Sequence, residues 1–139
     1  MLILDTDAVT LLHADHPAII RRLNELVGEE VAVTIVTRIE ILRGRFDHLL
    51  KASSDEQFLR AQRWLRSSEE RLNQIFTFYL DEPSLQHFRT LEGQKGLKKI
   101  GRADLLIASI ALGRNATLVT RNLRHFKLIP QLKCENWVD

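Results

Sequence analysis

Short apolar runs rich in β-branched residues alternate along the chain with longer segments in which apolar residues recur every three or four positions. The first pattern is typical of buried strands and the second of amphipathic helices. Together they predict four strands, at residues 2–4, 31–36, 75–80 and 116–119. Helices are predicted at about residues 7–13, 17–27, 37–50, 53–72, from 83 onward and 102–112. This alternation predicts an α/β fold with three layers (α/β/α) and a central, mainly parallel sheet of four to five strands.

A few residues mark where these elements begin and end. Asp5 or Thr6 is expected to cap the first helix. Ser53 and Glu56 have the spacing of a capping box for the helix that follows them. The stretch 93–101 holds three glycines and three lysines, so we expect a flexible loop there.

Length and composition restrict the class of protein. The chain has 139 residues, 45% hydrophobic and 27% charged, which fits a single globular domain over residues 1–139. The longest unbroken apolar stretches, such as Leu105–Ala108, are far shorter than the roughly 20 residues of a membrane span, so no membrane association is expected. One cysteine excludes an internal disulfide, and the N-terminus lacks the pattern of a signal peptide. We therefore expect a cytoplasmic protein.

The net charge of +2 conceals a strong division of charge along the chain. Residues 93–134 contain nine Lys or Arg and a single acid, Asp104, so this segment has a net charge of +8. The remainder has 11 basic and 17 acidic residues, which gives −6. A basic region attracts polyanions such as nucleic acids. The charge pattern fits a solvated basic surface without a partner equally well.

Polar residues follow three of the predicted strands directly. In a parallel sheet the carboxyl ends of the strands lie at one edge, where ligands bind. Residues distant in sequence are therefore expected to meet there, in three pairs that follow the first, second and last predicted strands: Asp5 and Asp7, Thr37 and Glu40, and Thr120 and Asn122.

Asp104 lies where an apolar residue is expected. At helical spacing it shares a face with Ile107, Ala108 and Ala111. A buried carboxylate needs a partner or a metal ion, although a favourable interaction with the helix dipole explains an acid in a first turn equally well.

Glu40 points away from the apolar face of its predicted helix, and periodicity alone favours an exposed ion pair with Arg43. A site is therefore predicted from three acids together, each at the end of a separate element. A carboxylate cluster without Cys or His favours Mg²⁺ or Mn²⁺, ions that activate water for attack on a phosphodiester. His13 and His16 have no third ligand near them in sequence, which disfavours a zinc site.

Over nearly its whole length the chain resembles the PIN-domain ribonucleases, particularly the VapC-type toxins of bacterial toxin–antitoxin pairs. The resemblance is carried by five motifs in order, at Ile3–Asp7, Thr37–Gly44, Ile100–Ala108, Leu118–Phe126, and the closing segments Ile129–Leu132 and Glu135–Trp137. It implies a metal-dependent endoribonuclease that cleaves structured RNA, commonly transfer RNA. It also implies a homodimer that a VapB-type antitoxin holds inactive.

The resemblance also implies which residues form the site. Asp5, Glu40 and Asp104 become the acidic ligands of Mg²⁺ or Mn²⁺ and belong to the catalytic set. Thr120 and Asn122 complete that set. The family often has Asp at the position of Asn122, so this chain has one charge fewer there. It commonly has Asn or Ser at the position of Asp7, where the extra carboxylate either compensates or caps the helix.

Substrate contacts are expected from Thr6, as a polar neighbour that orients ligands or water, and from three arginines, Arg43, Arg121 and Arg124. The guanidinium fork matches phosphate oxygens, and an ion pair or a solvated side chain is the alternative for each arginine.

The predicted helical hairpin over residues 37–73 is a candidate surface for the dimer or the antitoxin. Its aromatic residues Phe58 and Trp64 fit this interpretation and fit equally well as ordinary core residues.

Two alternative functions remain. Asp5-x-Asp7 and the apolar run that ends at Thr120 also resemble haloacid-dehalogenase-like phosphohydrolases, which require an acidic pair after a later strand. No acid follows Asp104 until Glu135, so that pair is missing. The other alternative is a non-catalytic PIN-like module that binds RNA or a partner, which Asn122 keeps open.

Overall fold

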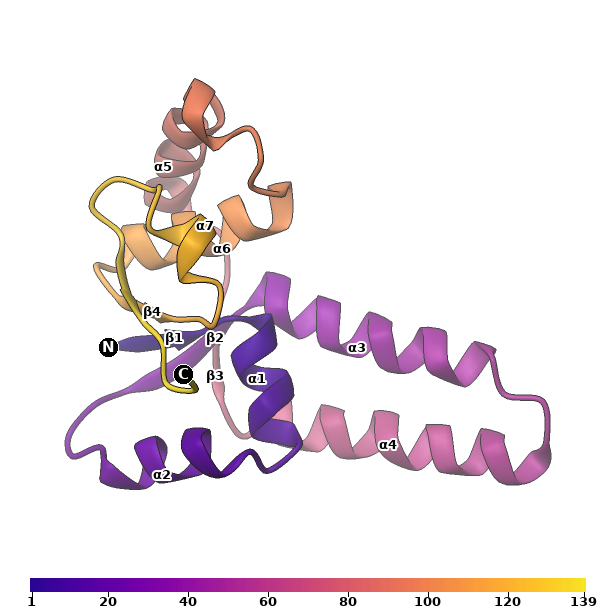
Figure 1. Cartoon of the computed structure of the whole chain (residues 1–139). Coiled ribbons are helices and arrows are strands. Elements are labelled where there is room, and N and C mark those ends of the chain that lie inside the picture. Colours follow the sequence, from indigo (N-terminus) through magenta and orange to yellow (C-terminus); the bar gives the residue numbers. More distant parts are fainter.

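A computed structural model describes all 139 residues, and its centre is a five-stranded parallel sheet with helices on both faces (Figure 1). The strands lie in the order β3-β2-β1-β4-β5, and every neighbouring pair is parallel. They are β1 (Leu2–Leu4), β2 (Val31–Thr34), β3 (Phe76–Phe78), β4 (Thr117–Val119) and β5 (Lys133–Glu135). The predicted three-layer fold with a parallel sheet is confirmed.

Eight helical segments connect and cover the strands. They are α1 (Thr6–His13), α2 (Pro17–Glu25), α3 (Ile35–Leu50), α4 (Asp55–Asn73), α5 (Glu82–Glu92), the 3₁₀ turn η1 (Lys95–Leu97), α6 (Arg102–Gly113) and α7 (Leu123–Phe126). None of the helices combines the length and apolar character needed to cross a membrane.

Alternate side chains of the central strands pack into two separate hydrophobic cores, one on each face of the sheet. Ile3 and Leu118 point to the face covered by α5 and α6, where they pack with Ile107 and Ile110. Leu2 and Leu4 point to the opposite face, which α1 and α2 cover. This period of two is what a sheet buried on both sides requires, and it fixes the register of the strands.

Helices α3 and α4 form a long hairpin that projects away from the sheet (Figure 1). Only its base is covered by the rest of the chain, through residues such as Ile41 and Leu72. Phe58 and Trp64 are each 45% exposed, so they are not core residues. Outside its base, the hairpin has no layer of this chain facing it, which leaves these aromatic side chains at the surface.

Side-chain caps shift several predicted boundaries. The second strand ends at Thr34 rather than residue 36, because the Thr34 hydroxyl accepts the backbone N–H of Thr37 and starts α3. The predicted capping box is displaced by one residue. Ser54 caps α4, and the Gln57 side chain folds back to Ser53.

Three other segments differ from the expectation. The third strand stops at Phe78, and Asp81 caps α5. The expected loop 93–101 contains η1 and is anchored by buried Leu97 and Ile100. Strand β5 and the short helix α7 had no clear signal, because β5 (Lys-Cys-Glu) lacks an apolar or β-branched run and α7 is only four residues long.

The two-core arrangement predicts a sharp contrast between two leucines ten positions apart. Leu118→Ala removes a fully buried side chain from the central sheet and should lower the free energy of unfolding by about 2–5 kcal/mol. Leu128→Ala, at a 53% exposed position, should lower it by less than about 1 kcal/mol. Urea denaturation followed by circular dichroism measures both, and equal losses would contradict the assigned core.

Candidate active site

An acidic pocket of about 180 Å³ lies at the carboxyl ends of β1 and β4, against the first turns of α1 and α6 and the second turn of α3. Its lining side chains are polar except for that of Phe126. The polar ones are Asp5, Thr6, Asp7, Glu40, Asp104 and Asn122. The structure thus brings together the three carboxylates expected to hold a metal, as well as Asn122 and Thr6. Their catalytic roles stay a prediction.

Asp5 is the most deeply buried acid of the pocket, at 5% exposure. Its backbone N–H extends the ladder between β1 and β4, and its side chain caps α1 by accepting the N–H of Ala8 at 2.8 Å. Burial raises the pKa of Asp5 from 3.8 to about 6. Hydrogen bonds from Thr120 and Ala8 oppose this shift, whereas the charges of Asp7 and Asp104 add to it.

Glu40 is held by the start of α1. The hydroxyl of Thr6 donates to Glu40 Oε1 at 2.7 Å and lies 3.0 Å from the hydroxyl of Thr37. The ion pair with Arg43 that periodicity favoured does not form. The reason is tertiary, because packing of α1 against α3 offers Glu40 a hydroxyl donor from another element.

Asp104 is half-buried in the first turn of α6. Burial raises the pKa of its carboxyl, and the nearby charges of Glu40 and Asp7 raise it further, with a partial offset from His125. The interpretation as a simple helix-dipole residue is therefore incomplete, because Asp104 also faces other acids across the pocket.

The residues after β4 form the remaining wall. Thr120 is buried, and its hydroxyl accepts the backbone N–H of Asn122 at 2.9 Å. The amide nitrogen of Asn122 donates to His125 Nδ1 at 3.0 Å, and the amide oxygen has no protein partner. Sequence reasoning missed His125. His125 lies one turn after Asn122 at the start of α7, which is the helical spacing that lets the two side chains meet.

The three arginines proposed for phosphate contacts do not line the acidic pocket. Arg43 lines a neighbouring groove between α3 and α6, which also includes Glu40. Arg121 makes an ion pair with Asp139 at 3.5 Å, and Arg124 is exposed on α7. Their role as substrate contacts stays a prediction.

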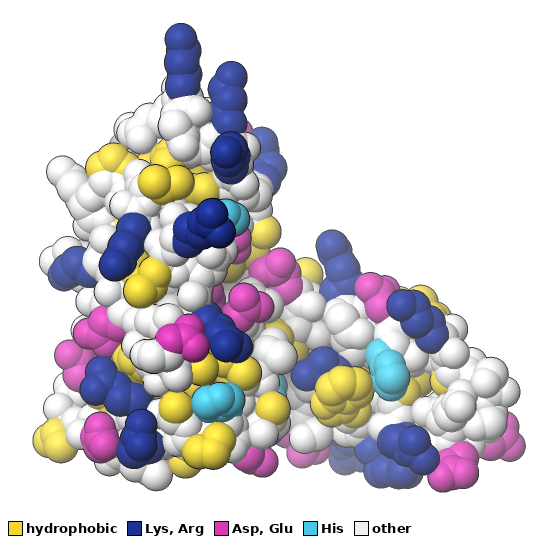
Figure 2. All heavy atoms as spheres, viewed as in Figure 1, with side chains coloured by type: hydrophobic (Ala, Val, Ile, Leu, Met, Phe, Trp, Pro, Cys, Tyr) yellow, Lys and Arg dark blue, Asp and Glu magenta, His cyan; other side chains and the backbone are white.

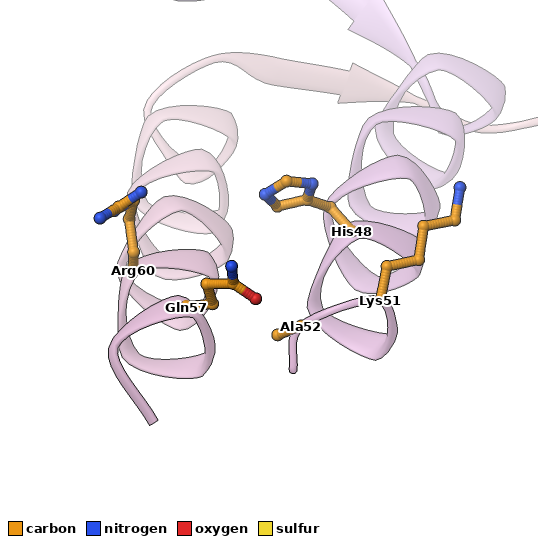
Figure 3. Close-up of a pocket in the computed structure, with 5 residues that line it drawn as sticks. All are labelled: His48, Lys51, Ala52, Gln57 and Arg60. Carbon is orange, nitrogen blue, oxygen red and sulfur yellow. The ribbon is translucent and has the colours of Figure 1, made fainter. Parts of the chain in front are cut away.

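A second polar pocket, of about 300 Å³, lies at the far tip of the hairpin (Figure 3). His48 and Lys51 from the end of α3 face Gln57 and Arg60 from α4, and no acid lines this pocket. It lies at the opposite end of α3 from Glu40 and shares no residue with the acidic pocket.

The acidic pocket has the donor chemistry of a divalent-cation site. Carboxylate and amide oxygens are the ligands that Mg²⁺ and Mn²⁺ prefer, and burial of Asp5 favours a positive charge beside it. No three His, Cys, Asp or Glu side chains are gathered as tightly as bound ligands are. The residues therefore fit such an ion by the type of their donor atoms, and the acids form an open cluster in which like charges repel one another.

A sequence profile of the PIN domain matches residues 2–131. The chain belongs to the PIN-domain family. Ribonuclease VapC1 of Haemophilus influenzae is 31% identical, over 96% of this chain and 96% of that protein. Ribonuclease VapC2 of Rickettsia felis is 56% identical over 61 residues, a match that covers 44% of this chain and 41% of that protein.

Solved structures of related complexes share this PIN fold. VapBC2 from Rickettsia felis, bound to a DNA fragment from its promoter, has a chain with a TM-score of 0.77 and 28% identity, with 98% of both chains covered. VapBC-1 from nontypeable Haemophilus influenzae gives a TM-score of 0.78 and 26% identity, over 99% of this chain and 98% of that chain.

The raised pKa of Asp5 predicts a specific pH dependence of stability without metal. The folded chain binds the Asp5 proton more tightly, at a pKa of about 6, than the unfolded chain does, near 3.8. Below pH 3.8 both states are protonated and the difference vanishes. Above pH 6 both are ionised, and only the folded state holds a desolvated charge. Ionisation of Asp5 should therefore cost stability as the pH rises through this window, by up to about 3 kcal/mol.

Asp5→Asn isolates this effect, because Asn keeps the cap on Ala8 and carries no charge. In EDTA the variant should be the more stable protein above pH 6, by about 1–3 kcal/mol, with the gap closing below pH 4. Urea denaturation between pH 4 and 8 measures this gap. The control is Asp47→Asn, which changes an exposed aspartate of α3. A gap that does not change with pH would refute the assignment.

Proposed function

We propose that this PIN-domain chain is a metal-dependent endoribonuclease, the toxin of a toxin–antitoxin pair. The observation that carries the proposal is the pocket in which Asp5, Glu40 and Asp104, from three separate elements, meet at the carboxyl edge of the sheet. Relatives named as ribonucleases support the reaction class, and one of them matches over 96% of both chains. The proposal treats residues 1–139 as a single PIN domain.

Asp5, Glu40 and Asp104 are the proposed ligands of Mg²⁺ or Mn²⁺, with the amide oxygen of Asn122 as a further donor. When bound, such an ion lowers the pKa of water and neutralises charge that develops on phosphate oxygens. In the proposed reaction the oxygen of a water molecule bonds to phosphorus and the water loses one proton. The bond from phosphorus to the leaving oxygen breaks, and the leaving oxygen takes up one proton.

The protein residues themselves supply position. The side chain of Asp5 accepts the Ala8 N–H at 2.8 Å, which holds its carboxylate at the start of α1. Thr6 fixes Glu40 in the same way. Thr120, buried beneath the pocket, links Asp5 to the backbone of Asn122. These bonds preorganise the acids at little entropic cost during the reaction.

RNA is the proposed substrate, with transfer RNA as the favoured class. A Salmonella typhimurium relative, 25% identical, is named a tRNA(fMet)-specific endonuclease. Exposed basic residues continue from α5 into the start of α6, and Lys and Arg side chains project from that end of the molecule (Figure 2). A basic surface beside an acidic pocket attracts the phosphate backbone and leaves the metal site free.

A VapB-type antitoxin is the proposed partner, since the solved relatives are VapBC complexes. The exposed apolar side chains of the hairpin are the proposed contact surface. Figure 2 shows apolar side chains among Lys and Arg along this projection. The residues are Ile39, Phe46, Leu50, Phe58, Leu59 and Trp64. We also propose a homodimer, for which the apolar groove between α3 and α6 is the candidate contact.

The phosphohydrolase alternative has less support. Asp7 does line the pocket, but Asp104 is the only acid from the second half of the chain that does so. The additional acidic pair that this chemistry requires is therefore missing. The non-catalytic alternative is decided by an activity measurement.

The endoribonuclease proposal predicts cleavage of a transfer RNA pool in the presence of Mg²⁺ or Mn²⁺. Asp5→Asn and Asp104→Asn should each lower the rate by at least about 100-fold, since loss of even an outer-shell partner of a metal ligand costs 10–100-fold. Their circular dichroism spectra should remain those of the parent. Asp47→Asn should keep full activity. Metal-independent cleavage, or full activity in both site variants, would overturn the proposal.

Metal binding should also stabilise the folded chain, because an ion that binds only the native state shifts unfolding by linkage. At Mg²⁺ concentrations 100-fold above the dissociation constant, the gain is about 2.7 kcal/mol. Thermal melts with and without millimolar Mg²⁺ measure it, and Asp104→Asn should abolish the increase in Tm. A melting curve of the parent protein that does not respond to metal would contradict a formed site.

A further inference from the structure

Three side chains connect α1 and α3 in a short hydrogen-bonded chain. Thr6 Oγ lies 2.7 Å from Glu40 Oε1 and 3.0 Å from Thr37 Oγ. The Glu40 carboxylate has no hydrogen to donate, so the single hydroxyl hydrogen of Thr6 goes to Glu40. The hydrogen between the two threonines must then come from Thr37. The bonds therefore run in one direction, from Thr37 to Thr6 to Glu40.

Thr37 uses its hydroxyl differently from Thr10 and Thr90, two other threonines that lie within helices. Thr10 and Thr90 each donate to the carbonyl four residues earlier in their own helix, the usual arrangement for this side chain. The hydroxyl of Thr37 bonds only to Thr6, on a different helix. Thr37 is also completely buried, and Thr34 holds its backbone N–H at 3.2 Å. Its position is thus fixed by the first turn of α3.

We propose that Thr37 is a positioning residue for Glu40 and acts through Thr6. This inference rests on the proposed metal site. It gives a role to Thr37, which opens the Thr37–Gly44 motif and does not line the pocket. Thr37 donates a hydrogen bond to the hydroxyl oxygen of Thr6. The hydrogen of the Thr6 hydroxyl then points to Glu40. The carboxylate of Glu40 is thereby held against Thr6, the residue that follows Asp5. Thr6 then has no hydrogen left to orient a substrate or a water.

The test compares Mn²⁺ affinity among variants by calorimetry, without RNA. Thr37→Val keeps the shape of the side chain and removes the donor, and it should weaken Mn²⁺ binding by about 10-fold, the lower end of the effect of second-shell partners. Thr37→Ser should bind as the parent does. Thr10→Val is the matched control, because it removes a hydroxyl that bonds within α1, and it should leave affinity unchanged.

A double-mutant cycle separates a hydrogen-bonded chain from simple packing. If Thr37 acts through Thr6, Thr37→Val should have no further effect on Mn²⁺ affinity once Thr6→Val is present. Cleavage assays on the same variants should show a lower kcat and an unchanged KM for RNA. Additive losses in the cycle, or parental affinity in Thr37→Val, would overturn the proposal.

Two further controls keep the result interpretable. If Thr37→Val fails to fold, Thr37→Ser and Thr37→Ala replace it, because these two differ only by the hydroxyl and only the Ala variant should lose affinity. A chain that binds Mn²⁺ with the predicted variant pattern but cleaves no RNA refutes the nuclease proposal and supports the role of Thr37. If the chain cleaves RNA but Thr37→Val changes neither Mn²⁺ affinity nor kcat, the nuclease proposal is supported and the role of Thr37 is refuted.

Discussion

The burial of Asp5 at the end of β1 is the constraint on which the rest of the site depends. The Asp5 carboxylate is only 5% exposed, so its charged form is poorly solvated. This burial raises its pKa to about 6. The neighbouring groups meet this cost only in part. The Ala8 N–H and the Thr120 hydroxyl bond to the Asp5 side chain, whereas Asp7 and Asp104 add like charge. The pocket is therefore a place where the fold gives up stability to hold acids together, which is common at functional sites.

The parallel sheet is what makes such a concentration of acids possible. Every crossover returns the chain to the same end of the sheet, so the residues that follow β1 and β4 meet the second turn of α3 and the first turn of α6. Each acid is then fixed by a short local bond. Asp5 caps α1, Glu40 is bonded to Thr6, and Asn122 is bonded to His125. The rigid scaffold sets the approximate distances, and these hydrogen bonds set the orientation of the side chains.

The surface around the pocket is divided by chemistry. The α3–α4 hairpin presents apolar side chains in a direction where no layer of this chain covers them. The segment around η1 and the start of α6 is basic and is anchored by buried Leu97 and Ile100. The near-neutral net charge of the chain therefore results from opposed regions. Under the proposed function, the apolar hairpin serves a protein partner and the basic segment serves RNA, with the acidic pocket between them in the fold.

The sequence by itself determined the layers of the fold, the order of the elements as far as β4 and the presence of acids at strand ends, because periodicity and strand-end position are local properties. It also identified Asp104 as a carboxylate on an otherwise apolar face. Tertiary structure alone decided the contacts of Glu40, for which periodicity favoured Arg43 and packing supplied Thr6 from α1. It also decided that Phe58 and Trp64 are exposed. Periodicity tells which residues share a face of a helix. What that face meets depends on where the other elements pack, and no local pattern of this chain encodes it.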